Sequence, residues 1–425
     1  MDILIKSARI INPGGAHHGK TRDILIVNGK IKQVASAISN DEIPEGIKTI
    51  DAKKYFVSPG WMDLKVNFRE PGEEEKEDLQ SGLKAAAAGG FTAVLLMPST
   101  SHPVQSKSDV EFIQSKTKNN LVDAYVSGCL TVDRKGNDMA ELYDMHQSGA
   151  VAFTDDKRPV EDAGMLMRTL QYTGNFNSTV IIFPDDPSIS HKQLINESIT
   201  SASTGMKGSP ALAEEIALSK AIRVCEYTKG KLHVSGISTA GSVKLVQQAK
   251  AKGITITADV YAHHLMIDDT RLQSFDSNLK VKPPFRGKSD ITALKKGIAE
   301  GIIDAICSDH SPHQTEQKDV EYEYAAHGII GLETTFAVAH TALSSSLDIE
   351  FIIDKFVNGP RKILNLPAAD IQVGETANLT LFSTDTEWTF SEKDIVSKSK
   401  NTPFIGTKFT GKVIGVINNN KTFGV

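Results

Sequence analysis

From about residue 57 onward, short apolar runs alternate with helical stretches, and this alternation constrains the fold more than any other feature. The helical stretches include EDLQSGLKAAAAGG and AEEIALSKAIRVCEYTKG. The apolar runs are FTAVLLMP (91–98), AVAFTDD (150–156), TVIIFPDD (179–186), KLHVSGIS (231–238), ITITADVY (254–261) and IIDAICSDHSPH (302–313). Repeated strand–helix units of this length predict an α/β protein built on a parallel (β/α)₈ TIM barrel.

The two ends of the chain show a different pattern, with strand-like runs and few helical stretches. Residues 1–56 contain two alternating runs, ILIKSARII and DILIVNGKIKQVA, with a hairpin signal at Asn28-Gly29. Strand-like runs return after about residue 360. We therefore expect residues 57–360 to form the barrel, and residues 1–56 together with 361–425 to form a small β-sandwich domain.

Composition excludes several classes of protein. The 425 residues, 40% of them hydrophobic, suffice for one large barrel and a smaller domain. The net charge of −5 comes without a basic block, which argues against nucleic acid as a partner. No run approaches the roughly 18 apolar residues of a membrane span. The cysteines, Cys129, Cys225 and Cys307, show no paired spacing and suggest inert thiols in a reducing compartment, so we expect a cytoplasmic protein.

The ends of the predicted strands carry the candidate functional residues, because the active site of such a barrel lies at the carboxyl ends of its strands. The first strand ends at Lys65, Asn67 and Arg69, and the alternation of side chains makes Lys65 and Asn67 project together. The later strand ends supply Ser99, Asp155, Asp156, Phe183, Asp185, Asp186, His233, Gly236, Asp309, His310 and His313. The segment SDHSPH carries the most side chains that could act as a base or bind a ligand. It indicates a general base or a ligand cluster, unless its side chains only cap a loop.

Several longer segments make the chain resemble the dihydroorotases of the amidohydrolase superfamily, in the class found alone or with aspartate carbamoyltransferase. The segments are SPGWMDLKVNFREPGEEEKED, AAAAGGFTAVLLMPST, GAVAFTDD, DDPSIS, ADVYAHHL, NLKVKPPFR, DAICSDHSPH, HGIIGLETTF and NTPFIGTKFTGKV. The resemblance runs nearly end to end. It implies a barrel with a small β domain, and a family activity that is zinc-dependent hydrolysis of a cyclic amide.

The departures from this family fall on its zinc ligands. The family's first strand reads D-L-H-V-H-L-R-E-P-G, and this chain has Lys65 and Asn67 at the two histidines. Phe183 stands at the histidine of H-x-E-D, and Gly236 at the second histidine of H-x-x-H-x-S-T. The resemblance retains Asp309, which is the family's proton shuttle, and the FTDD carboxylates.

The substrate contacts that the resemblance implies are partly retained. Arg69 and His313 match the family. Ser99 replaces the asparagine of M-P-N-T, Lys282 that of K-V-N-P-P, and His327 the proline of A-P-x-G-I. The pair His263-His264 occurs in the family without binding zinc, so we expect it to be structural.

The replaced ligands predict a chain without zinc, and we expect no cofactor. Neutral imidazoles and carboxylates hold Zn²⁺, whereas a lysine near neutral pH carries a proton on the nitrogen that would have to bind the metal. Buried carboxylates need a compensating charge. We therefore expect the Lys65 ammonium to lie near Asp309 or near the carboxylates of Asp155 and Asp156.

Three functions are consistent with the sequence. The first is a catalytically impaired dihydroorotase homologue, a pseudoenzyme with a structural or regulatory role in de novo pyrimidine biosynthesis. Aspartate carbamoyltransferase is the expected partner, and a homodimer the expected assembly. The second is an active dihydroorotase, or a related cyclic amide hydrolase, that converts carbamoyl aspartate to dihydroorotate with an altered metal centre. The third is a sensor that binds a small carboxylate metabolite.

Overall fold

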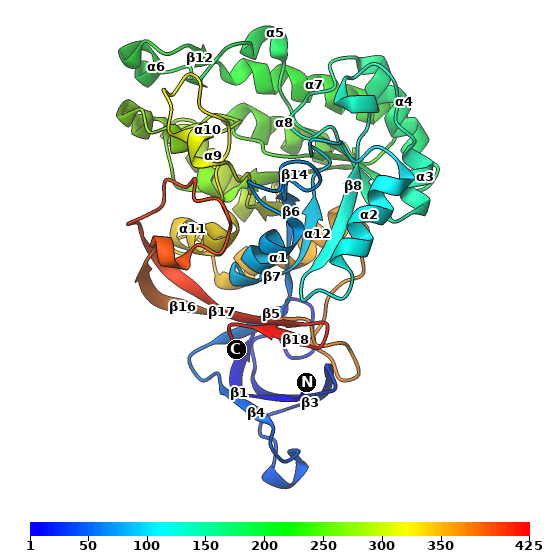
Figure 1. The fold of residues 1–425 in the computed structure, drawn as a ribbon, viewed down its shortest axis with the longest axis vertical. Coiled ribbons are helices and arrows are strands. Elements are labelled where there is room, and N and C mark those ends of the chain that lie inside the picture. The colour runs from blue at the N-terminus through cyan, green and yellow to red at the C-terminus, as the bar shows by residue number, and fades with distance from the viewer.

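The computed structural model describes residues 1–425 and contains a closed parallel sheet surrounded by helices (Figure 1). Val66 at the end of the first barrel strand pairs in parallel with His310, which follows the last strand, and this isolated bridge closes the sheet. The strands, in order, are β6 (Trp61–Val66), β7 (Phe91–Leu96), β8 (Asp123–Gly128), β9 (Ala150–Phe153), β10 (Thr179–Ile182), β13 (Leu232–Val234), β14 (Ile256–Tyr261) and β15 (Ala305–Cys307). The predicted (β/α)₈ barrel is confirmed.

One barrel strand had no counterpart among the predicted runs. β8 reads DAYVSG, and its first three residues are only partly buried. Because its one strongly apolar branched residue is Val126, the segment lacks the continuous apolar signal of its neighbours.

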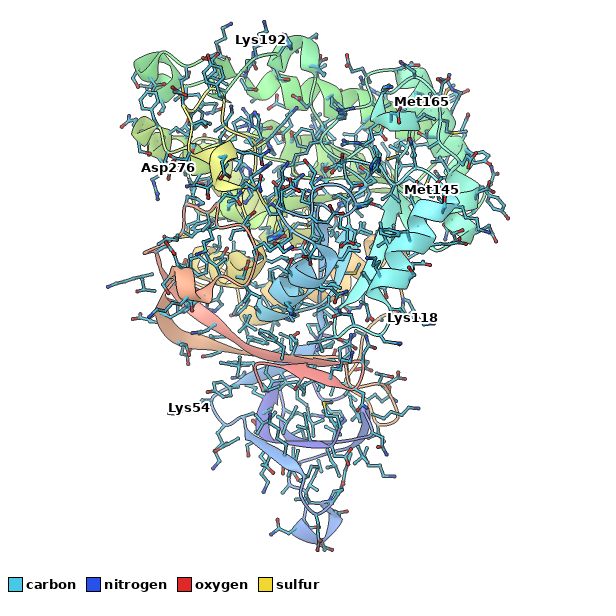
Figure 2. The ribbon with its side chains drawn as sticks, viewed as in Figure 1. Lys54, Lys118, Met145, Met165, Lys192 and Asp276 are labelled. Atoms are coloured by element: carbon cyan, nitrogen blue, oxygen red, sulfur yellow. The ribbon has the colours of Figure 1, made fainter.

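The helices of the barrel lie outside its strands. They are α1 (Leu79–Ala88), α2 (Lys107–Thr117), α3 (Leu142–Gln147), α4 (Ala163–Gly174), α7 (Ala211–Thr228), α8 (Ala240–Ala251), α9 (Lys288–Ala299), α11 (Thr335–Leu343) and α12 (Ile349–Ile363). Asp78 begins α1 by accepting the amide hydrogen of Ser81, as expected of an N-cap residue. Met145 and Met165, labelled in Figure 2, lie on α3 and α4 and are buried against the barrel core.

The second sheet takes strands from both ends of the chain. Its order is β18 (Lys421–Phe423), β17 (Lys408–Asn418), β16 (Leu379–Thr389), β5 (Phe56–Pro59), β1 (Ile3–Ile10), β2 (Thr21–Val27) and β3 (Lys30–Ala35), with β4 (Lys48–Asp51) on β1. The sheet curves so that β1 and β3 face β16 and β17 (Figure 1). The predicted hairpin turn is present, with positive φ at both Asn28 and Gly29. The exact division of the chain near residues 56 and 360 stays a prediction.

An aromatic cluster joins the second sheet to the barrel. Trp61 begins the first barrel strand, and its ring centroid lies 4.8 Å from that of Phe336, 5.5 Å from Phe356 and 5.3 Å from Phe382 on β16. Buried aromatic side chains contribute large apolar areas, so this cluster fixes the barrel against the sheet.

The three cysteines are buried and unpaired, as expected. No helix is long and apolar enough to cross a membrane.

Candidate functional site

Two lysine–aspartate pairs lie at the carboxyl ends of the barrel strands. The Lys65 ammonium forms an ion pair with the Asp156 carboxylate, and the side chains are 2% and 6% exposed. The Lys157 ammonium lies 2.6 Å from Oδ2 of Asp309, with side chains 18% and 0% exposed. The predicted ion pair of Lys65 is therefore confirmed, and Asp156 is the partner. The second pair, around Lys157, was not anticipated.

Three charged residues of the site have left-handed backbone conformations. The φ angles are 64° at Arg69, 54° at Asp156 and 52° at Asp309. This conformation costs a residue with a Cβ about 1–2 kcal/mol, and it persists only where the surroundings impose it. Each residue follows a barrel strand, so the sharp change of chain direction fixes the start of the side chain at the strand end.

The two pairs differ in how strongly they hold their charges. Burial raises the pKa of Asp156, but the ammonium groups of Lys65 and Lys157 outweigh burial and hold that pKa well below its usual value. Burial lowers the pKa of Lys65, and Asp156 and Asp309 more than reverse this. The pair of Lys65 and Asp156 is therefore stabilised in its charged form.

In the second pair, burial determines the direction of both pKa shifts. It raises the pKa of Asp309 despite the nearby ammonium groups of Lys157 and Lys65. It also lowers the pKa of Lys157, and the positive charge of Lys65 lowers it further, against the attraction of Asp309. Both shifts reduce the free-energy cost of moving a proton from Lys157 to Asp309, whereas the shifts in the first pair increase it.

Asn67 and Ser99 extend the first pair. The Ser99 hydroxyl lies 2.6 Å from Oδ1 of Asn67 and 2.5 Å from Oδ2 of Asp156. The structure thus brings together three of the residues that the sequence analysis singled out at separate strand ends. Asp155 does not join them. Its carboxylate accepts hydrogen bonds from the amides of Leu130 and Thr131 and from the Thr131 hydroxyl, and therefore holds a loop.

Arg69 and His313 contact each other. Nη2 of Arg69 lies 3.4 Å from Nε2 of His313, and Nε of Arg69 donates to the carbonyl of Pro312. Burial, with the positive charge of Arg69, lowers the pKa of His313 to about 3, so the imidazole is neutral at physiological pH. Nε2 of His313 also lies 3.0 Å from the carbonyl oxygen of His327.

Tyr261 occupies the space beside Gly236. A Cβ at Gly236 would lie 2.4 Å from Cζ and 2.5 Å from the hydroxyl oxygen of Tyr261, and the φ of Gly236 is 76°. No side chain fits at this position while Tyr261 stays in place. Phe183, at another position where the family has a ligand, is buried, and the ammonium of Lys282 lies 5.3 Å from its ring centroid.

Three further histidines, His233, His263 and His264, are enclosed by other side chains. Nε2 of His233 lies 2.9 Å from Oδ2 of Asp259 in the barrel interior. His263 and His264 are buried beside the ring of Phe285. The packing of this pair agrees with the structural role expected for it.

These residues do not fit zinc. The positions of the expected ligands carry an ammonium, an amide, a phenyl ring and no side chain, and these groups do not form a zinc site. The chain has no group of three or more histidine, cysteine, aspartate or glutamate side chains arranged to hold a metal. A divalent cation at Asp156 or Asp309 would also lie beside the ammonium groups that already neutralise these carboxylates.

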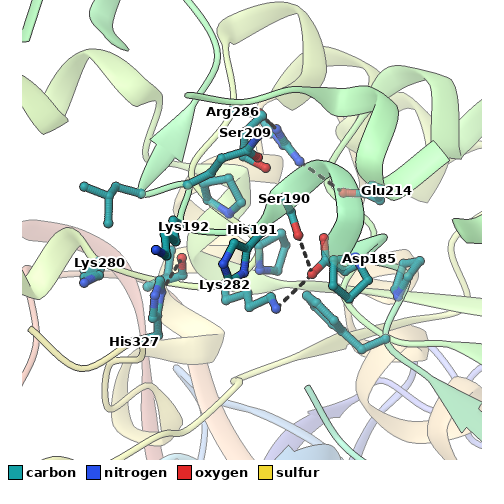
Figure 3. A pocket seen from close by; sticks show the side chains of 18 of the residues that line it. Asp185, Ser190, His191, Lys192, Ser209, Glu214, Lys280, Lys282, Arg286 and His327 are labelled. Carbon is teal, nitrogen blue, oxygen red and sulfur yellow. Dashed lines mark hydrogen bonds and ion pairs between the residues drawn. The ribbon is translucent and has the colours of Figure 1, made fainter. Parts of the chain in front are cut away.

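A cavity of about 330 Å³ adjoins the end of β10 (Figure 3). Three positions that depart from the family, Phe183, Lys282 and His327, line it together. Nζ of Lys282 lies 2.9 Å from Oδ2 of Asp185, which also accepts a hydrogen bond from Ser190. Lys192 and Lys280 line the same cavity, as do Arg286 and Glu214, which form an ion pair at 3.7 Å.

Among the residues around the two ion pairs, the sequence analysis missed Lys157 and Tyr261. Lys157 follows the FTDD segment directly, so a third charged residue at that strand end was a visible signal. The position of Tyr261 beside Gly236 had no signal in the sequence, because the two residues lie on neighbouring strand ends and meet only through the curvature of the barrel.

The chain is similar to known proteins over nearly its full length. A family model described as Dihydro-orotase-like matches residues 54–242. A dihydroorotase from Geotalea daltonii is 36% identical over 413 residues, which cover 97% of this chain and 96% of the relative. A dihydroorotase from Carboxydothermus hydrogenoformans is 39% identical over 416 residues, which cover 97% and 95%.

Solved structures match the fold. An L-hydantoinase (dihydropyrimidinase) from Arthrobacter aurescens superposes with a TM-score of 0.86 at 22% identity, over 99% of this chain and 95% of that one. A D-hydantoinase gives a TM-score of 0.84 at 19% identity, again over 99% and 95%. The barrel with its β domain and the near-complete match to the curated relatives together show that this chain belongs to the dihydroorotase family.

Proposed function

We propose that this chain is a catalytically impaired member of the dihydroorotase family, with a structural or regulatory role in pyrimidine biosynthesis. The observation that supports this proposal is the double ion pair of Lys65 with Asp156 and Lys157 with Asp309. The pairs neutralise the carboxylates with the protein's own ammonium groups, and so leave no charge for a metal to compensate.

Without a metal, the free-energy cost of generating hydroxide is large. Zinc generates hydroxide at neutral pH by lowering the pKa of water from about 15.7 to about 7, a difference of roughly 12 kcal/mol. No group near Asp309 supplies a comparable effect, since its nearest partner is an ammonium that donates to it. Asp309 therefore has no activated water to serve.

Turnover of dihydroorotate and carbamoyl aspartate by the purified chain, with and without added Zn²⁺, tests this proposal. We expect no turnover above background in either condition. Turnover that survives repurification and disappears in Asp309→Asn would contradict the proposal. It would favour the alternative of an active cyclic amide hydrolase, for which the contact of Arg69 with His313 is the supporting feature.

The partner in this proposal is aspartate carbamoyltransferase, and the chain itself is proposed to be a homodimer. The resemblance to dihydroorotases that associate with this transcarbamoylase supports the partner. Light scattering of the purified chain, alone and mixed with the transcarbamoylase from the same cells, would measure both assemblies. A monomer that does not change mass in the mixture would contradict this part of the proposal.

The cavity beside β10 supports a second candidate function, a sensor of a small carboxylate metabolite. Lys192 and Lys280 line this cavity, and neither forms an ion pair with a side chain; Lys280 donates only to the carbonyl of Glu323. Titration calorimetry with dihydroorotate and carbamoyl aspartate would test this function. Binding that Lys280→Met weakens, without turnover, would favour the sensor.

A further inference from the structure

We infer that Lys157 is a nucleophilic amine that forms an imine with a small 2-oxo acid. Of the two lysines at the centre of the barrel, Lys157 has the more exposed side chain, 18% against 2% for Lys65. Lys65 neutralises Asp156 in the interior, whereas part of the Lys157 side chain reaches the surface. This inference concerns the reactivity of one amine, and it goes beyond the proposed loss of hydrolase chemistry.

Asp309 can exchange a proton with this amine. Its Oδ2 lies 2.6 Å from the Lys157 ammonium. Its other carboxylate oxygen, Oδ1, is fully buried and has no hydrogen-bond partner. A buried oxygen without a partner is costly, so a ligand group that donates a hydrogen bond there would be favoured.

The positive charge of Lys65 favours the neutral amine form of Lys157. A lysine beside another cation and away from water loses its proton more readily, which is a known way to activate an amine for attack on a carbonyl. The positive charge of Lys65 acts on Lys157, and each of the two lysines pairs with one aspartate at the strand ends. The negative charge of Asp156 is already neutralised by Lys65.

Arg69 indicates the class of carbonyl compound. It lies near the carboxylates of the cluster, and the one carboxylate within ion-pair distance of its guanidinium, that of Glu73, is at 3.8 Å. A guanidinium binds carboxylates in a planar, two-point geometry. A small ligand is favoured, since the ring of Tyr261 lies 5.5 Å from Nζ of Lys157. A short 2-oxo acid meets both requirements.

The reaction balances with the groups present. The Lys157 ammonium gives one proton to Asp309, and its nitrogen lone pair forms a bond to the carbonyl carbon. A proton moves from nitrogen to oxygen to give a neutral carbinolamine. Asp309 then protonates the hydroxyl, which leaves as water while the carbon–nitrogen double bond forms. The net change joins one carbonyl compound to the ammonium as a protonated imine and releases one water, without oxidation or reduction.

Reductive trapping tests this inference. The purified chain is incubated with pyruvate and sodium cyanoborohydride, which reduces the imine to a stable secondary amine, and the modified lysines are located by peptide mass mapping. Lys135 is the matched comparison, because it also pairs with an aspartate, at 2.9 Å, but is 62% exposed. We expect Lys157 to be labelled at least about tenfold faster than Lys135. The inference would be overturned if the labelling rates increased with side-chain exposure, or if Lys157 carried no label.

Variants separate reactivity from folding. Lys157→Arg keeps a cation beside Asp309 and should abolish the label, while Lys135→Arg should leave labelling at Lys157 unchanged. Asp309→Asn should slow labelling about 100-fold, as expected for loss of general acid–base assistance. Arg69→Gln should slow labelling by pyruvate but not by acetaldehyde, which has no carboxylate; equal effects on both would overturn the role of Arg69. Circular dichroism of each variant verifies its fold, and none of these readouts depends on dihydroorotate turnover.

Discussion

Lys65 and Asp156 form an ion pair inside the barrel, 91 residues apart in the chain and almost fully buried. Removing either partner would leave an uncompensated charge out of contact with water. The pair therefore makes the stability of the barrel depend on residues that replaced, or adjoined, the metal-binding positions of the family.

The substitution Lys65→Met should destabilise the protein by about 3–5 kcal/mol, because it leaves the Asp156 carboxylate buried and unpaired. The free energy of unfolding from urea denaturation measures this effect. Lys135→Met, at an exposed lysine, should change it by less than about 0.5 kcal/mol. The double variant Lys65→Met/Asp156→Asn should recover part of the loss, and an unchanged or larger loss would contradict the charge argument.

Chelation should not affect stability. A metal that binds only the folded state raises the melting temperature, so removing it lowers that temperature. We expect the same thermal unfolding midpoint before and after dialysis against EDTA, and less than stoichiometric zinc by elemental analysis of the purified chain. Zinc at one or more equivalents, together with a lower midpoint after chelation, would contradict the conclusion that the site does not fit this metal.

Gly236→Ala should destabilise the chain through two separable effects. The positive φ of Gly236 disfavours any side chain, and the new Cβ would overlap with the ring of Tyr261. Gly253→Ala is the matched control, since Gly253 has a φ of 74° and no atom within 4 Å of a built Cβ. The excess loss at Gly236, measured by denaturation, should be about 1–3 kcal/mol. Equal losses at both positions would show that Tyr261 moves aside freely.

His313 should make the protein less stable as the pH falls. Its pKa is near 6.5 in the unfolded chain and about 3 in the folded protein, chiefly because of burial. The unfolded state therefore binds a proton that the folded state does not, and stability is lost as the pH falls from about 6.5 toward 3. The contribution is about 1.6 kcal/mol between pH 6.5 and 5.

The substitution His313→Gln removes this titration while it keeps polar atoms near Arg69. A plot of the free energy of unfolding against pH should become shallower between pH 6.5 and 4 by the equivalent of one proton. An identical slope in His313→Gln and the unaltered chain would contradict the assignment of this proton to His313.

The sequence by itself determined the fold class and the lack of zinc ligands. The alternation of apolar runs and helices is a local pattern, and it sufficed to predict the parallel barrel because each strand must be buried on both faces. The residue types at Lys65, Asn67, Phe183 and Gly236 are equally local facts, and none of the four is a usual zinc ligand.

Only the tertiary structure decided how the charges pair. Adjacent aspartates at the end of β9 have different partners: Asp155 accepts bonds from Thr131, and Asp156 pairs with Lys65. Lys157 and Asp309 are 152 residues apart and meet because the barrel brings β9 and β15 to one end. The partner of a charged side chain depends on backbone direction and on the space left by neighbours such as Tyr261. Those quantities arise only when distant segments pack.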